Sequence, residues 1–332
     1  MKKNQKGFSL LEIILSLSVG LLLFAGIMSV LIGMRTTTQV TNSLGELQEN
    51  GRFALSVITE DLMRQNFWGD LASPLNLSNS IANGLPSMPA ATDCKGGGLN
   101  NSSFPQALGH FRTLWGMTAL SNNPINCIDD ARVGSDILQI KRVLANPLPP
   151  LADGSPGNPA NNSYWLSSNI TNGIIFPGTM VAPFVNNSQL WPYQHHVYYV
   201  RDETQGDLNV PVLMKATLKN GGASLMNFQP LIEGIEVIRF MYGVDTDSDR
   251  VVNAYISAPR MTEDYWNNTN AKILAVKIYI LARNILPDKN YQNTKSYLVG
   301  DMQVISNDNY RRLLLMSTVT LHNSGVETWS GI

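Results

Sequence analysis

The chain has 332 residues, of which 44% are hydrophobic and 15% charged, and its formal net charge is −1. A chain of this length and apolar content can bury a substantial core, which excludes an intrinsically disordered protein. Opposite charges are nearly balanced and no basic stripe occurs, so the sequence argues against direct binding to nucleic acid.

The first predicted element is a membrane-spanning helix. Residues 13–34 carry no charge, and this stretch at helical rise exceeds the roughly 30 Å of hydrocarbon that a helix must cross. It is too long for the core of an ordinary cleaved secretory signal. Lys2, Lys3 and Lys6 precede the span and only Arg35 follows closely, which places the N-terminus in the cytoplasm and the bulk of the chain outside.

A glutamate, Glu12, stands at the start of this apolar segment. A carboxylate at the centre of a bilayer costs about 2.5–3.5 kcal/mol, so the pattern predicts a partner for Glu12. The alternative is a side chain near enough to the cytoplasmic interface to stay hydrated, because the penalty is smallest near a helix start.

The helical pattern continues beyond the membrane. Apolar residues recur at steps of three and four as far as Leu62, while the charged residues, Asp61 among them, fall mostly elsewhere. This spacing is typical of an amphipathic helix. We therefore expect one long helix, with a transmembrane part over 8–34 and an amphipathic part over 35–66.

Several glycines interrupt this helix, each costing about 1 kcal/mol against alanine in water. They are either bends or points of close packing, a second use that small residues have at membrane helix interfaces. The sequence leaves both alternatives open for Gly20, Gly26, Gly33, Gly45 and Gly51.

Residues 67–332 are expected to form a β-rich globular domain with long loops near 69–106 and 146–163, where Asn, Ser, Pro and Gly accumulate. The remaining segments are rich in β-branched and aromatic residues with partial alternation, which favours a mainly antiparallel sheet. The predicted fold class is α+β, a long N-terminal helix packed on that sheet. The strand-like segments are residues 136–144, 196–201, 210–218, 235–244, 271–283 and 312–322.

The two cysteines, Cys94 and Cys127, are the whole supply. Outside the cytoplasm an even pair predicts a disulfide, although two unpaired buried thiols remain the alternative. Neither cysteine belongs to a C-x-x-C pattern, so redox catalysis is not indicated.

The segment Lys-Gly-Phe-Ser-Leu-Leu-Glu at residues 6–12 resembles the processing site of type IV prepilins. In that family a short basic leader ends in Gly, an aromatic residue begins the mature chain, and Glu is its fifth residue. The resemblance implies a leader over 1–7, cleavage between Gly7 and Phe8 by a prepilin peptidase, N-methylation of Phe8, and assembly into a helical filament. Glu12 would then pair with the positively charged amine of Phe8, its own or that of a neighbouring subunit.

Residues 45–69, 275–283 and 311–323 are similar to the PilW-type minor pilins. Members of that group often end with Arg-Asn after the last strand, whereas this chain has His322 and Asn323 there. The resemblance is to a pilin-like fold with a transmembrane and then amphipathic helix.

The resemblance implies a minor pilin of a type IV pilus, which joins a tip or priming complex that initiates assembly and supports twitching motility, adhesion and DNA uptake. Its expected partners are the prepilin peptidase, other minor pilins, the major pilin, a tip adhesin and the inner membrane. The precursor would be a single-pass inner-membrane protein of a Gram-negative bacterium, periplasmic in bulk and found in the pilus after assembly. The alternatives are a J-type pseudopilin of a type II secretion system and, from another class, a membrane-anchored periplasmic binding module.

An acidic turn supplies a further candidate site, because Asp245, Asp247 and Asp249 alternate as at the start of an EF-hand calcium loop. Arg250 stands where that loop needs Gly and Ile256 where it needs Glu, which excludes an ordinary EF-hand. A looser calcium turn and a solvated acidic turn both remain, and the frequency of Asp in turns favours the second. No other cofactor is expected.

Catalytic motifs are not found in the sequence. His195 and His196 are adjacent and would face opposite sides of a strand, so they would not share a metal. Without a nucleophile elbow, a zinc-protease motif or a P-loop, the sequence predicts a protein that is not an enzyme.

Overall fold

The computed structural model describes residues 7–72, 92–107, 109–152, 155, 157–221, 225–269 and 271–323. The predicted leader lies outside these residues except for Gly7, and so do parts of the loops expected near 69–106 and 146–163. The chain forms two compact units, Met1–Glu46 and Leu47–Ile332.

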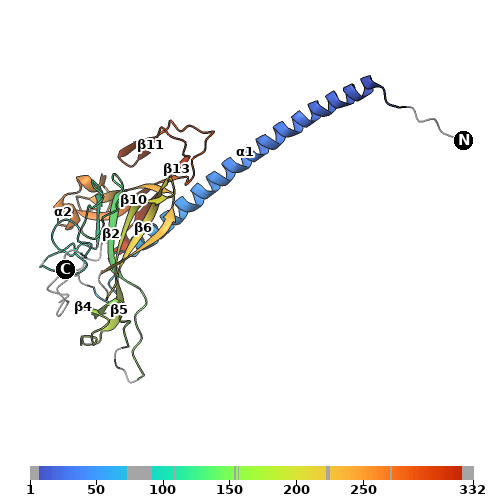
Figure 1. Cartoon of the computed structure of the whole chain (residues 1–332). Coiled ribbons are helices and arrows are strands. Elements are labelled where there is room, and N and C mark those ends of the chain that lie inside the picture. The colour runs from blue at the N-terminus through green and yellow to red at the C-terminus, as the bar shows by residue number, and fades with distance from the viewer. Residues whose placement is uncertain are drawn as a thin grey trace. The chain divides into compact units, whose positions relative to one another are not determined.

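The described residues contain one long helix followed by a series of strands, drawn in Figure 1 from blue to red. The elements in chain order are α1 (Leu10–Met63), β1 (Leu114–Thr118), β2 (Asp136–Val143), β3 (Tyr164–Ser168), β4 (Gly173–Pro177), β5 (Gln189–Gln205), β6 (Leu208–Leu218), β7 (Met226–Glu233), β8 (Ile235–Asp245), β9 (Ala254–Ser257), the 3-10 turn η1 (Ala258–Arg260), α2 (Glu263–Trp266), β10 (Lys272–Arg283), β11 (Ser296–Val299), β12 (Met302–Ile305) and β13 (Arg312–Thr320).

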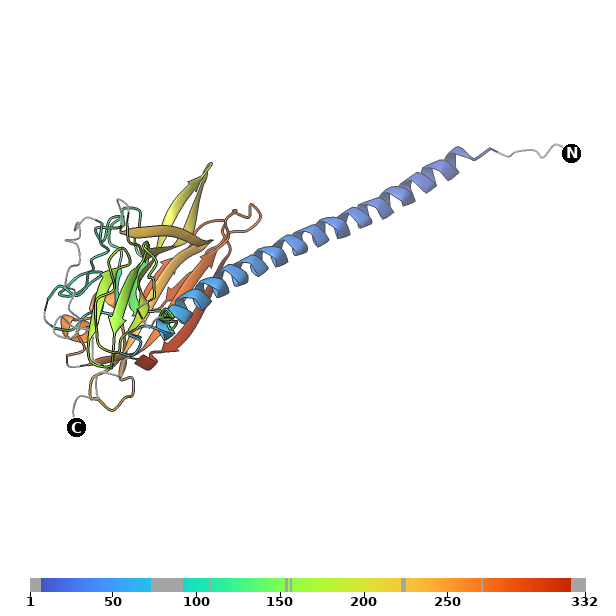
Figure 2. The ribbon, with the colours of Figure 1, turned by 90° about the horizontal axis from the view of Figure 1, so that it is seen from below.

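Two larger sheets and a two-stranded ribbon make up the globular unit, and every strand pair in them is antiparallel. The seven-stranded sheet runs β1-β2-β5-β3-β4, with β6 paired to β5 and β7 to β6. The four-stranded sheet runs β13-β10-β8-β9, and β11 pairs with β12. Figure 2 shows the four-stranded sheet, orange to red, beside the green and yellow strands of the other. The α+β prediction is confirmed.

One apolar core lies between the two sheets and the last part of α1. Leu47, Ala54, Ile58 and Leu62 are buried in it, at steps of four and seven residues that place them on one face of the helix. The amphipathic pattern therefore identified the face of α1 that packs on the sheets.

Gly51 allows this helix to approach β13 closely, because a Cβ at that position would overlap the side chain of Leu315. The sequence left open whether the helix glycines are bends or points of close packing, and Gly51 is a point of close packing. Among the described residues a Cβ at Gly20, Gly26, Gly33 or Gly45 would meet nothing within 4 Å, so packing within the chain does not require those four.

The strand-like segments of the sequence correspond to β2, β5, β6, β8, β10 and β13, but β5 is much longer than expected and seven shorter strands were not predicted. β3 and β4 have five residues each and are bounded by Asn- and Gly-rich turns. So few residues carry little alternation, and their strand conformation comes from pairing with β5 and with each other.

A disulfide joins Cys94 to Cys127, with their Cα atoms 4.9 Å apart. It ties the segment before β1 to the loop between β1 and β2. A cross-link closing a loop of this length is typically worth about 2–4 kcal/mol, chiefly by restricting the unfolded chain.

Replacing Ile58 by Ala should lower the free energy of unfolding by about 2–5 kcal/mol, because this fully buried side chain leaves a cavity between α1 and the sheets. Ser56→Ala, at an exposed position on the same helix, should change it by less than about 0.5 kcal/mol. Denaturant unfolding of the detergent-solubilised chain measures both. Equal effects of the two substitutions would contradict the packing described for α1.

Candidate functional site

The first residues of α1 form a capping box. The backbone N–H of Leu11 donates to Ser9 Oγ (3.3 Å), and the backbone N–H of Ser9 donates to Glu12 Oε2 (3.4 Å). This reciprocal arrangement satisfies N–H groups that a helix start leaves unpaired, and the positive end of the helix dipole favours a carboxylate there. The S-x-x-E spacing of Ser9 and Glu12 is the sequence pattern of a capping box, and the sequence analysis did not identify it.

Glu12 therefore has a hydrogen-bond partner at the start of its own helix. One carboxylate oxygen accepts the Ser9 N–H, and an ionised carboxylate has about four acceptor positions in all. The Glu12 carboxylate can therefore accept a second hydrogen bond, including one from a charged donor.

The helix surface that follows is apolar and uncovered. Every residue from Gly7 to Arg35 is exposed, Leu22 to 75%. In the described part of the chain, the length and composition of α1 would allow this helix to cross a membrane. Such a surface is stable in lipid or against other apolar helices, because water would disfavour it by about 25 cal/mol for each Å² exposed.

At its other end α1 carries a buried carboxylate that the amphipathic pattern had assigned to the polar side. Asp61 is 3% exposed. Its carboxylate accepts hydrogen bonds from Arg142 Nε (2.6 Å) and from the hydroxyl of Tyr198 (2.8 Å). The second carboxylate oxygen also lies 2.5 Å from His196 Nδ1. Arg142 comes from β2, and His196 and Tyr198 come from β5, so this cluster joins the helix end to two neighbouring strands.

The electrostatics of the cluster keep Asp61 ionised. Burial acts to raise the pKa of this carboxyl, but His196 and Arg142 outweigh it and hold the pKa well below its usual value. Burial lowers the pKa of His196 and so favours the neutral imidazole. Asp61 opposes this effect but does not outweigh it. Burial likewise raises the pKa of Tyr198, so its hydroxyl remains a donor.

A surface hollow of about 190 Å³ opens beside this cluster. Lys215 of β6 reaches into its lining with its amine 5.4 Å from the centre of the Tyr198 ring. Glu60 and Arg64, which also line it, form an exposed ion pair at 2.8 Å. The hollow is thus rich in charge, and sequence analysis gave no sign of it because its members come from separate elements.

The two adjacent histidines do face opposite sides of β5. His196 contacts Asp61, whereas His195 Nδ1 lies 2.8 Å from Ser103 Oγ. Their partners differ, so the strand does not bring the two imidazoles to one site.

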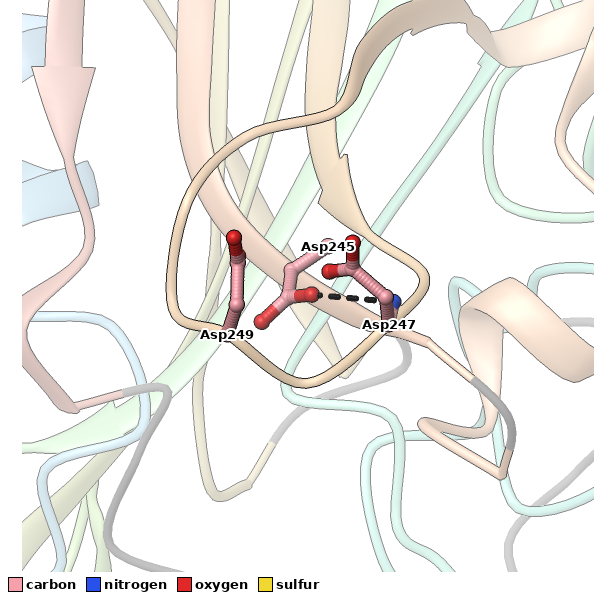
Figure 3. Close-up of side chains that lie close together, drawn as sticks. All are labelled: Asp245, Asp247 and Asp249. Carbon is pink, nitrogen blue, oxygen red and sulfur yellow. Dashed lines mark hydrogen bonds between the residues drawn. The ribbon is translucent and has the colours of Figure 1, made fainter.

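The acidic turn between β8 and β9 brings Asp245, Asp247 and Asp249 together, with carboxylate oxygens within 4.8 Å of one another. Figure 3 shows the three side chains within the turn. Asp245 accepts backbone N–H groups from Asp247 (3.2 Å), Ser248 (2.7 Å) and Arg250 (2.9 Å). These bonds give Asp245 a structural role in the turn with or without an ion.

Arg250 adopts a positive φ of 68°, the conformation that Gly would take most easily at this point. Ile256 lies in β9, paired with β8, and provides no carboxylate. The turn thus has the three carboxylates that begin an EF-hand calcium loop, but Ile256 provides no carboxylate at the position of the last ligand. The calcium site stays a prediction.

Comparison with protein-family models gives two matches. Residues 197–323 match the model described as type IV pilus-assembly protein W, and residues 2–28 match the prokaryotic N-terminal methylation motif. The first match begins within β5 and extends past β13, while the second includes the capping box and the start of the apolar helix. No curated protein and no solved structure matches the chain.

Asp61→Asn should lower the free energy of unfolding by about 3–5 kcal/mol at neutral pH, since it leaves Arg142 buried without its countercharge. Glu60→Gln, one residue away in an exposed pair, should cost less than about 1 kcal/mol.

The same cluster makes stability depend on pH. The lowered pKa of His196 means that the unfolded chain takes up its proton first, so stability falls as the pH drops below 6.5. The lowered pKa of Asp61 removes further stability below 3.8. Denaturant unfolding of the wild type should therefore give a free energy of unfolding that falls from pH 7 to pH 3, and His196→Gln should reduce the part of this fall that lies above pH 4. An equal fall in both proteins above pH 4 would contradict a buried His196 with a lowered pKa.

Calcium should raise the thermal midpoint of the wild type if the acidic turn holds an ion, with a stabilisation of about 2.7 kcal/mol at 100 times Kd. Asp247→Asn should weaken this response, because a carboxylate ligand is lost. Magnesium at the same concentration is the control for ionic strength. An unchanged midpoint with calcium would leave the turn as a solvated acidic loop.

Proposed function

We propose that this chain, which is similar to PilW-type type IV pilins over residues 197–323 and carries the methylation motif over residues 2–28, acts as a minor pilin in a complex that starts pilus assembly. The observation that carries the proposal is an uncovered apolar helix, with the methylation motif at its start, on a chain whose domain matches a pilus-assembly family. An apolar helix of this kind anchors the precursor in the membrane and can later pack among the helices of a filament.

Starting a filament is a distinct physical problem. A helical filament repeats one heterologous contact, so its first subunits lack the neighbours that stabilise later ones. A small complex of minor pilins supplies those neighbours in advance. In such a complex this chain would contribute its exposed helix as one of the packing surfaces.

Glu12 is proposed to orient the subunit within that helix bundle. After cleavage at Gly7 the new amine of Phe8 carries a positive charge, and a neighbouring Glu12 would accept it in an apolar surrounding. Separating a buried pair costs about 3–5 kcal/mol. A helix that enters one step out of register would leave both charges unpaired, so the pair would select the correct position.

Glu12→Gln separates this role from helix capping, because the amide retains an acceptor for the Ser9 N–H but loses the charge. We expect this variant to be processed to a chain that begins at Phe8 but to support few or no surface pili. Ser9→Ala should weaken the cap by about 1 kcal/mol and leave assembly largely intact. Intact mass and counts of surface pili in a strain lacking the native protein measure both.

The other outcomes identify the alternatives. If Glu12→Gln assembles as the wild type does, Glu12 acts only as a cap. Loss of protein secretion with normal pili in the deletion strain would indicate a J-type pseudopilin. A chain that retains Met1 whether or not the prepilin peptidase is present would indicate a plain membrane anchor of a periplasmic binding module, and the assembly proposal would be wrong.

A further inference from the structure

A lysine amine and an asparagine amide meet in the interior behind the disulfide. Lys141, at the centre of β2, is completely buried, and its Nζ donates to Asn101 Oδ1 (3.0 Å) and to the backbone carbonyl of Arg112 (2.9 Å). Asn101 is also completely buried and donates through Nδ2 to the carbonyl of Gly97 at 2.9 Å. Neither group belongs to the Asp61 cluster or to the acidic turn.

The surroundings of this pair exclude water. The ring of Phe111 lies 5.1 Å from Lys141 Nζ. A Cβ at Gly96 would overlap both Asn101 Nδ2 and the indole of Trp115, so the chain packs directly against the amide. The pair is therefore enclosed and held in position by its neighbours, a condition that favours reaction between adjacent groups.

Asp93 provides a buried carboxylate in the same region of the interior. It accepts hydrogen bonds from the Ser103 hydroxyl (2.6 Å) and from the Ser103 backbone N–H (3.1 Å), and its charge acts on the Lys141 amine. Burial lowers the pKa of Lys141 to about 7, with Asp93 opposing and Arg112 adding to the effect. A large share of the molecules thus holds a neutral, nucleophilic amine near neutral pH.

The distance is compatible with bond formation. The carbonyl carbon of Asn101 lies one C=O bond, about 1.23 Å, from Oδ1, so Nζ is at most about 4.2 Å from that carbon. Reacting atoms in near-attack geometry are about 3–3.5 Å apart. Nζ must therefore move toward Cγ by about 1 Å before the bond can form.

We propose that Lys141 and Asn101 form an intramolecular amide cross-link. Lys141 Nζ attacks Cγ of Asn101, the Nζ–Cγ bond forms and the Cγ–Nδ2 bond breaks. The proton that Nζ loses passes to Nδ2, which leaves as ammonia. The step needs no oxidant and no co-reactant, because amine and primary amide give a secondary amide and ammonia.

The cross-link would interleave with the disulfide along the chain, since it joins residues 101 and 141 while the disulfide joins 94 and 127. A force applied to the segment before β1 would then be transmitted to β2 directly through the Asn101–Lys141 bond. Such reinforcement suits a subunit under tension, although the chemistry does not depend on the proposed function.

The test is the mass of the wild-type chain, purified in detergent from membranes. The expected mass is about 17 Da below that of the disulfide-bonded sequence, the loss of one ammonia, and a protease digest should contain a branched peptide that joins Asn101 to Lys141. A mass equal to that of the disulfide-bonded sequence would overturn the proposal without any variant.

Matched variants exclude other losses of ammonia, such as ring closure of an asparagine onto the backbone. Lys141→Met should restore the full mass and remove the branched peptide, whereas Lys215→Met, at a half-buried lysine outside the pair, should retain both signs of the cross-link. A loss of about 17 Da that persists in Lys141→Met would contradict the proposal.

Discussion

The Asp61 carboxylate connects the helix to the domain. It lies on the last turn of α1 and accepts hydrogen bonds from Arg142 of β2 and Tyr198 of β5, with His196 Nδ1 at 2.5 Å. Apolar packing at Ile58 and Leu62 gives the helix end its stability but no directional preference. The charge cluster adds direction, because a rotation or shift of α1 would leave buried charges unpaired. It thereby sets how the amphipathic part of the helix lies on the sheets.

One continuous helix serves two environments. Its first part exposes apolar residues along its whole circumference, and its last part buries a single face. The capping box at Ser9 and Glu12 begins the helix within the apolar segment, so a charged side chain there stabilises the helix before it meets another subunit. In the proposed assembly the same carboxylate has two uses in succession, first within its helix and then between subunits.

The interior of the domain contains buried polar and charged groups, and they lie in separate clusters. Asp61 organises one and Asp93 another, on opposite sides of β5, through His196 and His195 respectively. Buried polar groups of this kind are stable only when each finds its partners. They restrict the packing of the strands, and the buried amine of Lys141 lies against the amide of Asn101.

The sequence by itself determined the α+β class, the long apolar helix, the packing face of α1 and the family resemblance, because length, hydrophobic period and a short processing motif are local properties. It did not determine the short strands β3 and β4, whose conformation depends on pairing. Nor did it show that Asp61 and Lys141 are buried, since charged residues are expected at the surface. Their partners, Arg142 and Asn101, are 81 and 40 residues away. Only the tertiary structure brings such groups into contact, and only there do burial and neighbouring charge set their pKa.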